Sequence, residues 1–344
     1  MVRAYVAQGL PVSKALQIAE ISHNQYYHQT TGGKPGREVT ITTQCMIQGQ
    51  IIECPNTEVV EEMEKVLEDP DLQYGYKRMT AAMLLLGYLI GCKKVYRLMK
   101  ENGLLQRRRK PGVRKRVLYR RVTPTRPLEV LEMDIKYQWV EEYQRHAYIF
   151  TILDTFTRAV LYQYVGYHIT QHEVKAAWEY VIVHILQPLD MLNRKLTIEV
   201  RNDNGPQFAA KLVQSFFAEN QLGQVFTHPY TPQENGHIES FHAILGEHLS
   251  RFSFHTLQEL EQNIEKFYQK YNRIRLHGSI ARLSPLMFWN LFNQGCIKSV
   301  MTRHNRRVFK LTVPHWELSG NESLREFPVQ IEACRASKKK RVAA

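Results

Sequence analysis

Residues 131–139 alternate strictly between apolar or aromatic side chains at the odd positions and polar side chains at the even ones. The polar members are Glu132, Asp134, Lys136 and Gln138. Because successive side chains of a β-strand point to opposite faces, this pattern predicts a half-buried strand with one polar face. The polar face carries an acid, Asp134, in its middle.

Further strand patterns follow, and then strands alternate with helices. We expect strands over residues 146–154, 158–165, 195–201 and 224–227, and helices over residues 173–186 and 206–220. The first three strands can form an antiparallel meander. Strands first, then strand–helix alternation, resembles the order of a ribonuclease H-like core. We therefore expect an α/β domain with a mixed sheet over residues 127–292.

Two more acids lie where such a core would expose them. Asp203 follows a predicted strand in the turn sequence Asp203-Asn-Gly-Pro-Gln-Phe, where Asn-Gly permits a sharp turn. Glu239, separated from Asp203 by 35 residues, lies in a predicted helix and off its apolar stripe, with Asn235 and His242 on the same face as Glu239. Carboxylates on rigid elements are the ligands that Mg²⁺ prefers, and two Mg²⁺ ions can promote phosphodiester chemistry.

Each acid also has an ordinary interpretation. Acids are common on the polar face of a sheet, in Asp-Asn-Gly turns and on solvated helices. Asp154 competes as a metal ligand, but we interpret it as a turn acid that can pair with Arg158. The spacing of His237, Glu239 and His242 could suggest zinc, yet it does not put both histidines on one helical face.

The region before the core reads as helical. Residues 1–35 outline a helix-turn-helix, with a second helix near Ser22, although any small helical hairpin looks similar. Residues 36–56 are predicted to be a linker. Residues 57–105 predict a helix-turn-helix DNA-binding domain whose last helix presents Lys93, Lys94 and Arg97, the alternative being a three-helix bundle with a cationic surface.

Positive charge is concentrated in one segment. The net charge is +13, and residues 107–126 contain ten Lys or Arg and no acid. A solvated linker and a phosphate-binding arm are compatible interpretations of this basic arm, residues 106–126. We expect its DNA contacts from Arg107, Arg108, Arg109, Lys110, Arg114, Lys115 and Arg116. Residues 293–344 read as a small, basic tail that contains a strand.

Other protein classes are disfavoured. Five scattered cysteines without a Cys-x-x-Cys pair argue against a disulfide framework or a zinc finger. No apolar run reaches the roughly 18 residues of a membrane span, so we expect a cytoplasmic protein that associates with the nucleoid when bound to DNA.

The combination of motifs resembles a known family. Asp134, then Asp203-Asn-Gly-Pro-Gln-Phe, then Asn235-Gly-His-Ile-Glu239-Ser-Phe is similar to the catalytic core shared by retroviral integrases and bacterial insertion-sequence transposases. Residues 73–79 and 94–104 resemble the helix-turn-helix that precedes this core in one insertion-sequence group, whose transposase is often made by fusing two reading frames. By resemblance, Asp134, Asp203 and Glu239 correspond to the catalytic, metal-binding acids.

The resemblance implies an enzyme that cuts and joins DNA. It would bind terminal inverted repeats and target DNA as a multimer, free 3′-hydroxyl ends and transfer them, using two Mg²⁺ ions or Mn²⁺ in their place. The alternatives are an inactive DNA-binding protein or transposition inhibitor, and a nuclease without strand transfer. Two positions depart from the family pattern: Lys136 stands where Thr is common, and Gly246 where a basic residue usually contacts the terminal DNA.

Overall fold

The computed structural model describes residues 2–27, 39–47, 49–106, 123–193, 197–228, 232–302 and 307–329. It divides into two compact units, Met1–Ile41 and Thr42–Ala344. The first unit contains α1 (Val2–Ala7), α2 (Val12–Ile18) and α3 (His23–Tyr27), packed around Val2, Ala15 and Leu16. The backbone N–H of Gln25 donates to the Ser22 hydroxyl at the start of α3, as a capping residue does. The helical prediction therefore holds for the described part of residues 1–35.

The second unit begins with a hairpin where we expected a linker. β1 (Thr42–Ile47) pairs antiparallel with β2 (Gln50–Pro55), and the short strand β3 (Tyr88–Leu89) adds to the other edge of β1. Cys45 and Cys54 are buried beneath the hairpin in the core of the helical region that follows. The linker expected over residues 36–56 is thus replaced by strands over residues 42–55, because burial against the helices orders this segment.

The helical region matches the predicted helix-turn-helix. It consists of α4 (Asn56–Glu68), η1 (Pro70–Leu72), α5 (Tyr76–Leu85) and α6 (Cys92–Glu101). Val95, Leu98 and Met99 of α6 pack inward, as their spacing predicts, and are at most 4% exposed. Gly87 has a φ of +96°, and its Cβ position would lie 2.8 Å from the carbonyl oxygen of Met46. Only glycine fits there, at the end of α5.

A five-stranded mixed sheet forms the centre of the core domain. Its order is β6-β5-β4-β7-β8, with β4, β5 and β6 antiparallel and β7 and β8 parallel to β4. The strands are β4 (Val130–Val140), β5 (Arg145–Asp154), β6 (Val160–Gly166), β7 (Ile198–Asn202) and β8 (Leu222–Phe226). This order confirms the predicted meander and the ribonuclease H-like arrangement.

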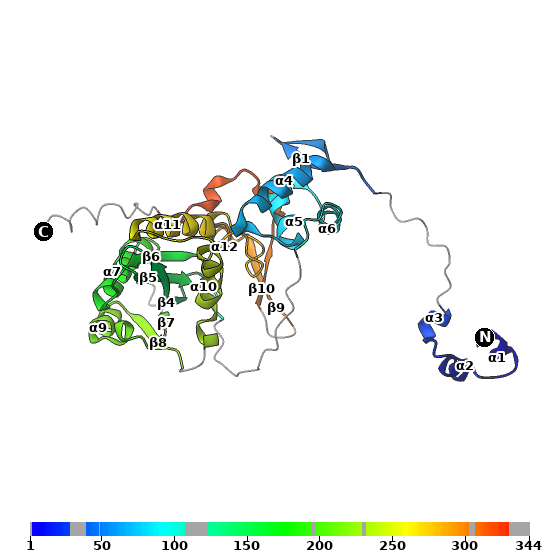
Figure 1. Cartoon of the computed structure of the whole chain (residues 1–344), viewed down its shortest axis with the longest axis horizontal. Coiled ribbons are helices and arrows are strands. Elements are labelled where there is room, and N and C mark those ends of the chain that lie inside the picture. The colour runs from blue at the N-terminus through cyan, green and yellow to red at the C-terminus, as the bar shows by residue number, and fades with distance from the viewer. Residues whose placement is uncertain are drawn as a thin grey trace. The chain divides into compact units, whose positions relative to one another are not determined.

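Helices cover both faces of this sheet (Figure 1). One face packs on α7 (Gln171–Val181), η2 (Ile182–Leu186), α8 (Pro206–Ala209) and α9 (Lys211–Glu219), and the other on α10 (Gly236–Leu249) and α11 (Leu257–Arg273). The helix predicted over residues 206–220 is broken, since Ala210 is extended between α8 and α9. Leu131 and Met133 face α7, so the alternating polar side chains of β4 face α10.

The tail completes the helix-turn-helix core rather than standing apart. α12 (Pro285–Asn293), the hairpin of β9 (Ile297–Met301) and β10 (Arg307–Leu311), η4 (His315–Leu318) and η5 (Glu322–Arg325) follow one another. Phe156 at the end of the sheet stacks against Phe288 and Phe309, and Ile297, Leu318 and Leu324 join the apolar cluster of α4, α5 and α6. A helical region of about 50 residues buries too little surface alone, so this packing stabilises it.

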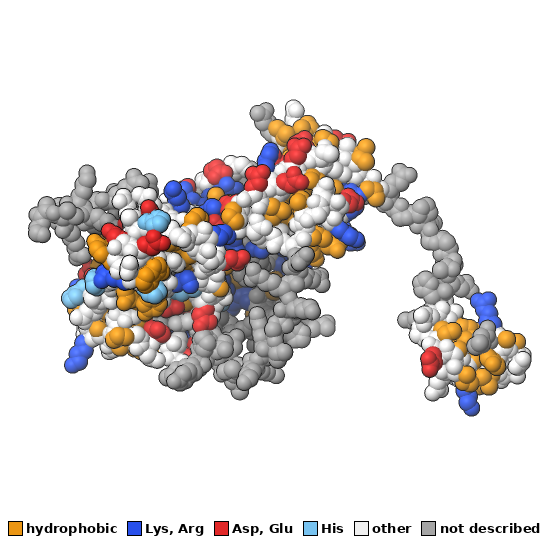
Figure 2. All heavy atoms as spheres, viewed as in Figure 1, with side chains coloured by type: hydrophobic (Ala, Val, Ile, Leu, Met, Phe, Trp, Pro, Cys, Tyr) orange, Lys and Arg blue, Asp and Glu red, His pale blue; other side chains and the backbone are white. Residues whose placement is uncertain are grey.

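Charged side chains of both signs mix on the visible face of the second unit (Figure 2). The positive excess is elsewhere, because the segment 107–126 carries ten of the thirteen net charges and its residues 107–122 lie outside the described residues. None of the described helices is long and apolar enough to cross a membrane.

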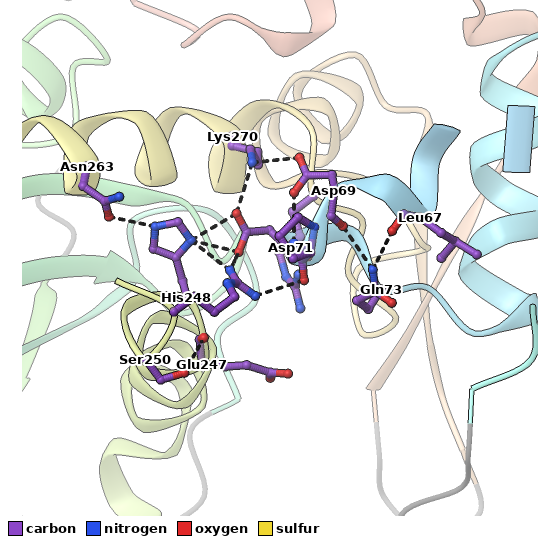
Figure 3. A network of polar contacts seen from close by, with 12 residues as sticks. Leu67, Asp69, Asp71, Gln73, Glu247, His248, Ser250, Asn263 and Lys270 are labelled. Atoms are coloured by element: carbon purple, nitrogen blue, oxygen red, sulfur yellow. Dashed lines mark hydrogen bonds and ion pairs between the residues drawn. The ribbon is translucent and has the colours of Figure 1, made fainter. Parts of the chain in front are cut away.

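A buried charge cluster joins η1 to the helices of the core (Figure 3). Asp71 accepts hydrogen bonds from His248 on α10, from Arg251 just after it, and from Lys270 on α11 at 3.1 Å. The second ring nitrogen of His248 lies 2.8 Å from Asn263. Burial alone would raise the pKa of Asp71, but the hydrogen bonds and charges of His248 and Lys270 hold that pKa below its usual range. We call these residues the Asp71 cluster.

Candidate active site

The sheet brings Asp134 and Asp203 to neighbouring positions. In the parallel ladder of β4 and β7, Glu132 pairs with Arg201. Two residues further along each strand are Asp134, still within β4, and Asp203, immediately after β7 ends. The Gly205 N–H donates to Asp203 at 3.0 Å, which holds the carboxylate in the turn that the Asp-Asn-Gly sequence predicts.

Glu239 approaches from the first turn of α10. The apolar stripe of this helix is buried as predicted, with Ile238, Phe241, Leu245 and Leu249 at most 2% exposed, whereas Glu239 is exposed. An acid in the first turn is favoured by the positive end of the helix dipole. The stripe fixes the rotation of α10 and thereby directs Glu239 away from the core.

The polar face of β4 follows α10 for two turns. The backbone N–H of Ile238 donates to Glu132 at 2.6 Å, and His242 Nδ1 lies 3.3 Å from Asp134 Oδ2. One turn later, a Cβ at Gly246 would lie 3.2 Å from the ammonium nitrogen of Lys136. Steps of two residues on the strand and four on the helix cover similar distances, so the two elements stay in contact.

The three acids are electrostatically coupled. Burial raises the pKa of Asp203, a hydrogen bond from Gly205 opposes this, and the charge of Asp134 raises it further. Burial and the charge of Asp134 also raise the pKa of Glu239. In the described part of the chain, none of the three pairs with Lys or Arg, and Asp134 contacts His242 and accepts the backbone N–H of Ile135. Negative charge therefore accumulates here without a fixed positive partner.

This donor set suits a hard divalent cation. No three His, Cys, Asp or Glu side chains among the described residues gather closely enough to hold one ion by themselves. Mg²⁺ is commonly held by one or two carboxylates, with water and substrate phosphate as the other ligands. Asp134, Asp203 and Glu239 supply such oxygens, and their mutual repulsion is what a cation would relieve.

Asp154 has a different environment from these acids, as its interpretation as a turn acid predicts. It is fully buried and accepts hydrogen bonds from the backbone of Leu128 and from both the backbone and the hydroxyl of Thr157. Its expected partner Arg158 instead donates its guanidinium to the Thr155 carbonyl. Asp154 therefore fixes the turn between β5 and β6.

Two residues near the acids were not predicted as site residues, although Lys136 departs from the family pattern. Glu132 is fully buried, and burial raises its pKa to about 7, against the hydrogen bond from Ile238. Lys136 is half-buried against Gly246. Both lie two residues from Asp134 and so share its face of β4. This spacing in the sequence could have identified them. Asn235 is 5% exposed at the N-cap position of α10.

The predicted DNA-contacting residues of α6 differ in their exposure and in the contacts that they already make. Lys93 is exposed, but Lys94 donates to the Thr42 carbonyl on β1, and burial followed by the nearby Arg97 lowers its pKa. Arg97 lies 4.0 Å from Glu101. Lys94 thus also anchors the hairpin. The predicted contacts at Arg107, Arg108, Arg109, Lys110, Arg114, Lys115 and Arg116 lie outside the described residues.

Comparison with known families assigns both parts of the second unit. A family model described as an integrase core domain matches residues 124–232, and a second with the same description matches residues 220–285. A model described as an HTH-like domain matches residues 56–112.

Individual proteins are similar to parts of this chain. An uncharacterized 39.2 kDa protein of insertion element IS476 from Xanthomonas euvesicatoria is 25% identical over 240 residues, which cover 68% of this chain and 65% of that protein. The InsK protein of insertion sequence element IS150 from Escherichia coli K12, named as a transposase, is 23% identical over 82% of this chain and 95% of its own length. The solved HTLV-2 integrase catalytic core domain in complex with magnesium is 19% identical, with a TM-score of 0.33 over 45% of this chain and 92% of that one.

The family models place the HTH-like domain directly before the integrase core, and the relatives come from insertion elements. The chain therefore combines an HTH-like domain with an integrase core, and in this arrangement it is similar to bacterial insertion-sequence transposases.

Proposed function

We propose that this protein cuts and joins DNA strands at the ends of a mobile element. In the first step, water attacks a phosphodiester at the element end and leaves a free 3′-hydroxyl. In the second, that hydroxyl attacks a phosphodiester of the target, so one bond forms as another breaks. The observation that carries this proposal is the coupling of Asp134, Asp203 and Glu239 from three separate elements, without a Lys or Arg ion pair among the described residues.

The chain's own residues would hold the acids ready for this chemistry. His242 orients Asp134, the Gly205 N–H orients Asp203, and the packed stripe of α10 directs Glu239. Mg²⁺, or Mn²⁺ in its place, would be held by these carboxylates and would neutralise charge on the phosphoryl oxygens. Preorganised acids of this kind need little rearrangement when substrate arrives.

DNA recognition would come from the HTH-like domain and the basic arm. Lys93 on α6 is exposed for backbone contact, and the arm adds seven cations between Arg107 and Arg116. Each phosphate contact steepens the salt dependence of binding by about 0.9 in log–log slope. Handling two element ends together calls for a homo-multimer on DNA. Neutralising the seven cations should weaken duplex binding and flatten its salt dependence; an unchanged slope would remove the arm from the interface.

A cleavage and joining assay tests the enzymatic proposal. The full chain is mixed with a duplex that ends in the terminal repeat found beside its gene, and with Mg²⁺. We expect nicked and joined products from the wild type, none from Asp203→Asn, and wild-type yields from Asp190→Asn, which changes an exposed acid in the turn after η2.

Two alternative functions correspond to other outcomes of that assay. If the wild type and Asp203→Asn both bind DNA without cutting it, the protein is a DNA-binding relative or inhibitor rather than an enzyme. If nicked products form but no joined ones, it is a nuclease without strand transfer.

A further inference from the structure

Lys136 stands out among the cations of the core domain. It lies two residues after Asp134 on the same face of β4, and its side chain is half-buried. Among the described residues it has no carboxylate partner and donates no hydrogen bond. Lysines are mostly exposed, and fully buried ones are almost always paired. A half-buried lysine without a partner, on the strand face of Asp134, therefore needs a separate explanation.

The ammonium group of Lys136 rests on α10 where that helix has no side chain. A Cβ at position 246 would lie 3.2 Å from Nζ and 3.5 Å from Cε of Lys136. The 3.2 Å contact is tight, so a side chain at position 246 would require the end of Lys136 to shift by a few tenths of an ångström. Gly246 is seven residues after Glu239, which places both on one side of the helix, two turns apart. Lys136 thus puts a cation on the same side of α10 as Glu239.

The position suits a phosphate other than the one that reacts. Along β4, Lys136 is two residues, or about 7 Å, beyond Asp134. Gly246, which its ammonium group approaches, is about 10 Å beyond Glu239 along α10. A DNA strand running past the acids carries its next charges at such distances. A single ammonium binds a phosphate as a point charge without regard to base identity.

We propose that Lys136, seated over Gly246, binds a DNA backbone phosphate next to the one held at the acids. The proposal deepens the proposed function, since it assumes that DNA lies across the three carboxylates. It also unites two departures from the family pattern: the cation that is missing from position 246 is supplied by the strand opposite.

The test measures duplex binding against KCl concentration, with EDTA present so that no turnover occurs. We expect Lys136→Gln to make the log–log salt slope shallower by about 0.9, the value for one lost phosphate contact. Lys136→Arg should keep the wild-type slope. Lys175→Gln is the matched control, because Lys175 pairs with Glu179 on α7, across the sheet from α10. Its slope should not change.

A reciprocal exchange of residues tests the contact between Lys136 and Gly246. Lys136→Thr alone should make the salt slope shallower by the same amount. Lys136→Thr combined with Gly246→Lys should restore the slope, because the new lysine lies at the position that the Lys136 ammonium group contacts. Melting temperatures near the wild-type value show that the variants remain folded. An unchanged slope in Lys136→Gln, or no recovery in the exchange, overturns the proposal.

This outcome is independent of the enzymatic proposal. If the wild type and Asp203→Asn behave alike in the cleavage assay, the enzymatic proposal fails. The salt slopes still report whether Lys136 contacts phosphate. If the slopes fail while cleavage depends on Asp203, only the role of Lys136 is lost.

Discussion

Helix α10 has a group of carboxylates at each end, and the two groups are opposites. Near its start lie Asp134, Asp203 and Glu239, and burial together with the charge of Asp134 raises the pKa values of Asp203 and Glu239. Near its end, Asp71 is surrounded by His248, Arg251 and Lys270, and its pKa is held down.

The difference is between a group of charges arranged for function and one that stabilises a contact between parts of the fold. A buried acid that has acquired cations and hydrogen bonds stabilises the contact it makes, here between η1 and the core helices. Acids that repel each other without fixed cations destabilise the fold, and such arrangements are concentrated at functional sites. Changes at the first end of α10 should therefore affect activity, and changes at the second should affect stability.

The largest effect is expected at the end of α10 that carries the candidate active site. Glu239→Gln removes one charge from the coupled acids, so cleavage should fall roughly 10³-fold, because metal-assisted charge neutralisation is worth several kcal/mol. The melting temperature should stay level or rise, since the lost charge was repelled by Asp134. Initial cleavage rates and thermal melts measure both. Glu219→Gln, at the exposed end of α9, is the control; a Glu239→Gln enzyme of normal rate would break the comparison.

The opposite result is expected at the Asp71 cluster. Asp71→Asn leaves Lys270, Arg251 and His248 with little compensation, and loss of one partner from a buried charge cluster costs about 3 kcal/mol. Urea unfolding should show this loss. Asp69→Asn removes only one partly exposed partner of Lys270, at 2.7 Å, and should cost below about 1 kcal/mol. Equal effects of the two substitutions would mean that the burial of Asp71 does not matter.

Acid should weaken this end of α10 selectively. The folded pKa of Asp71 is depressed below the reference value of 3.8, so its contribution is fully present above that value and is lost as pH falls toward the folded pKa. The difference in melting temperature between the wild type and Asp71→Asn should be constant above about pH 5 and should shrink below pH 4. A difference that stayed constant down to pH 3 would show that the pKa of Asp71 is not depressed.

Local patterns in the sequence predicted what depends on local periodicity. The alternation around Asp134 predicts β4. The stripe of Ile238, Phe241 and Leu245 predicts which face of α10 is buried and hence that Glu239 lies away from the core. Together with the turn at Asp203, these patterns were sufficient to place the three acids, because each acid is fixed by its own element and the sheet order then brings the elements together.

Contacts between distant residues were not predictable in this way. Asp71 and His248 are 177 residues apart, and nothing in either local pattern indicates the partner. Lys136 and Gly246 are two separate departures from the family pattern, and only the packing of β4 on α10 relates them. The hairpin of β1 and β2 was missed for the same reason, since its short strands are ordered by Tyr88 of β3 and by the burial of Cys45.

The smallest effect should come from Glu132, an acid at the active-site end that is nonetheless structural. It accepts the Ile238 N–H at the start of α10, and burial raises its pKa to about 7. Glu132→Gln keeps an acceptor and should change stability by less than about 0.5 kcal/mol, whereas Glu132→Leu leaves a buried N–H unpaired and should cost about 1–2 kcal/mol. Urea unfolding separates the two. Because Ile238 adjoins Glu239, the leucine variant should also lose cleavage activity while the glutamine variant retains it. If both variants cut DNA normally, the start of α10 is held by its apolar stripe alone, and Glu132 belongs to neither end of the comparison.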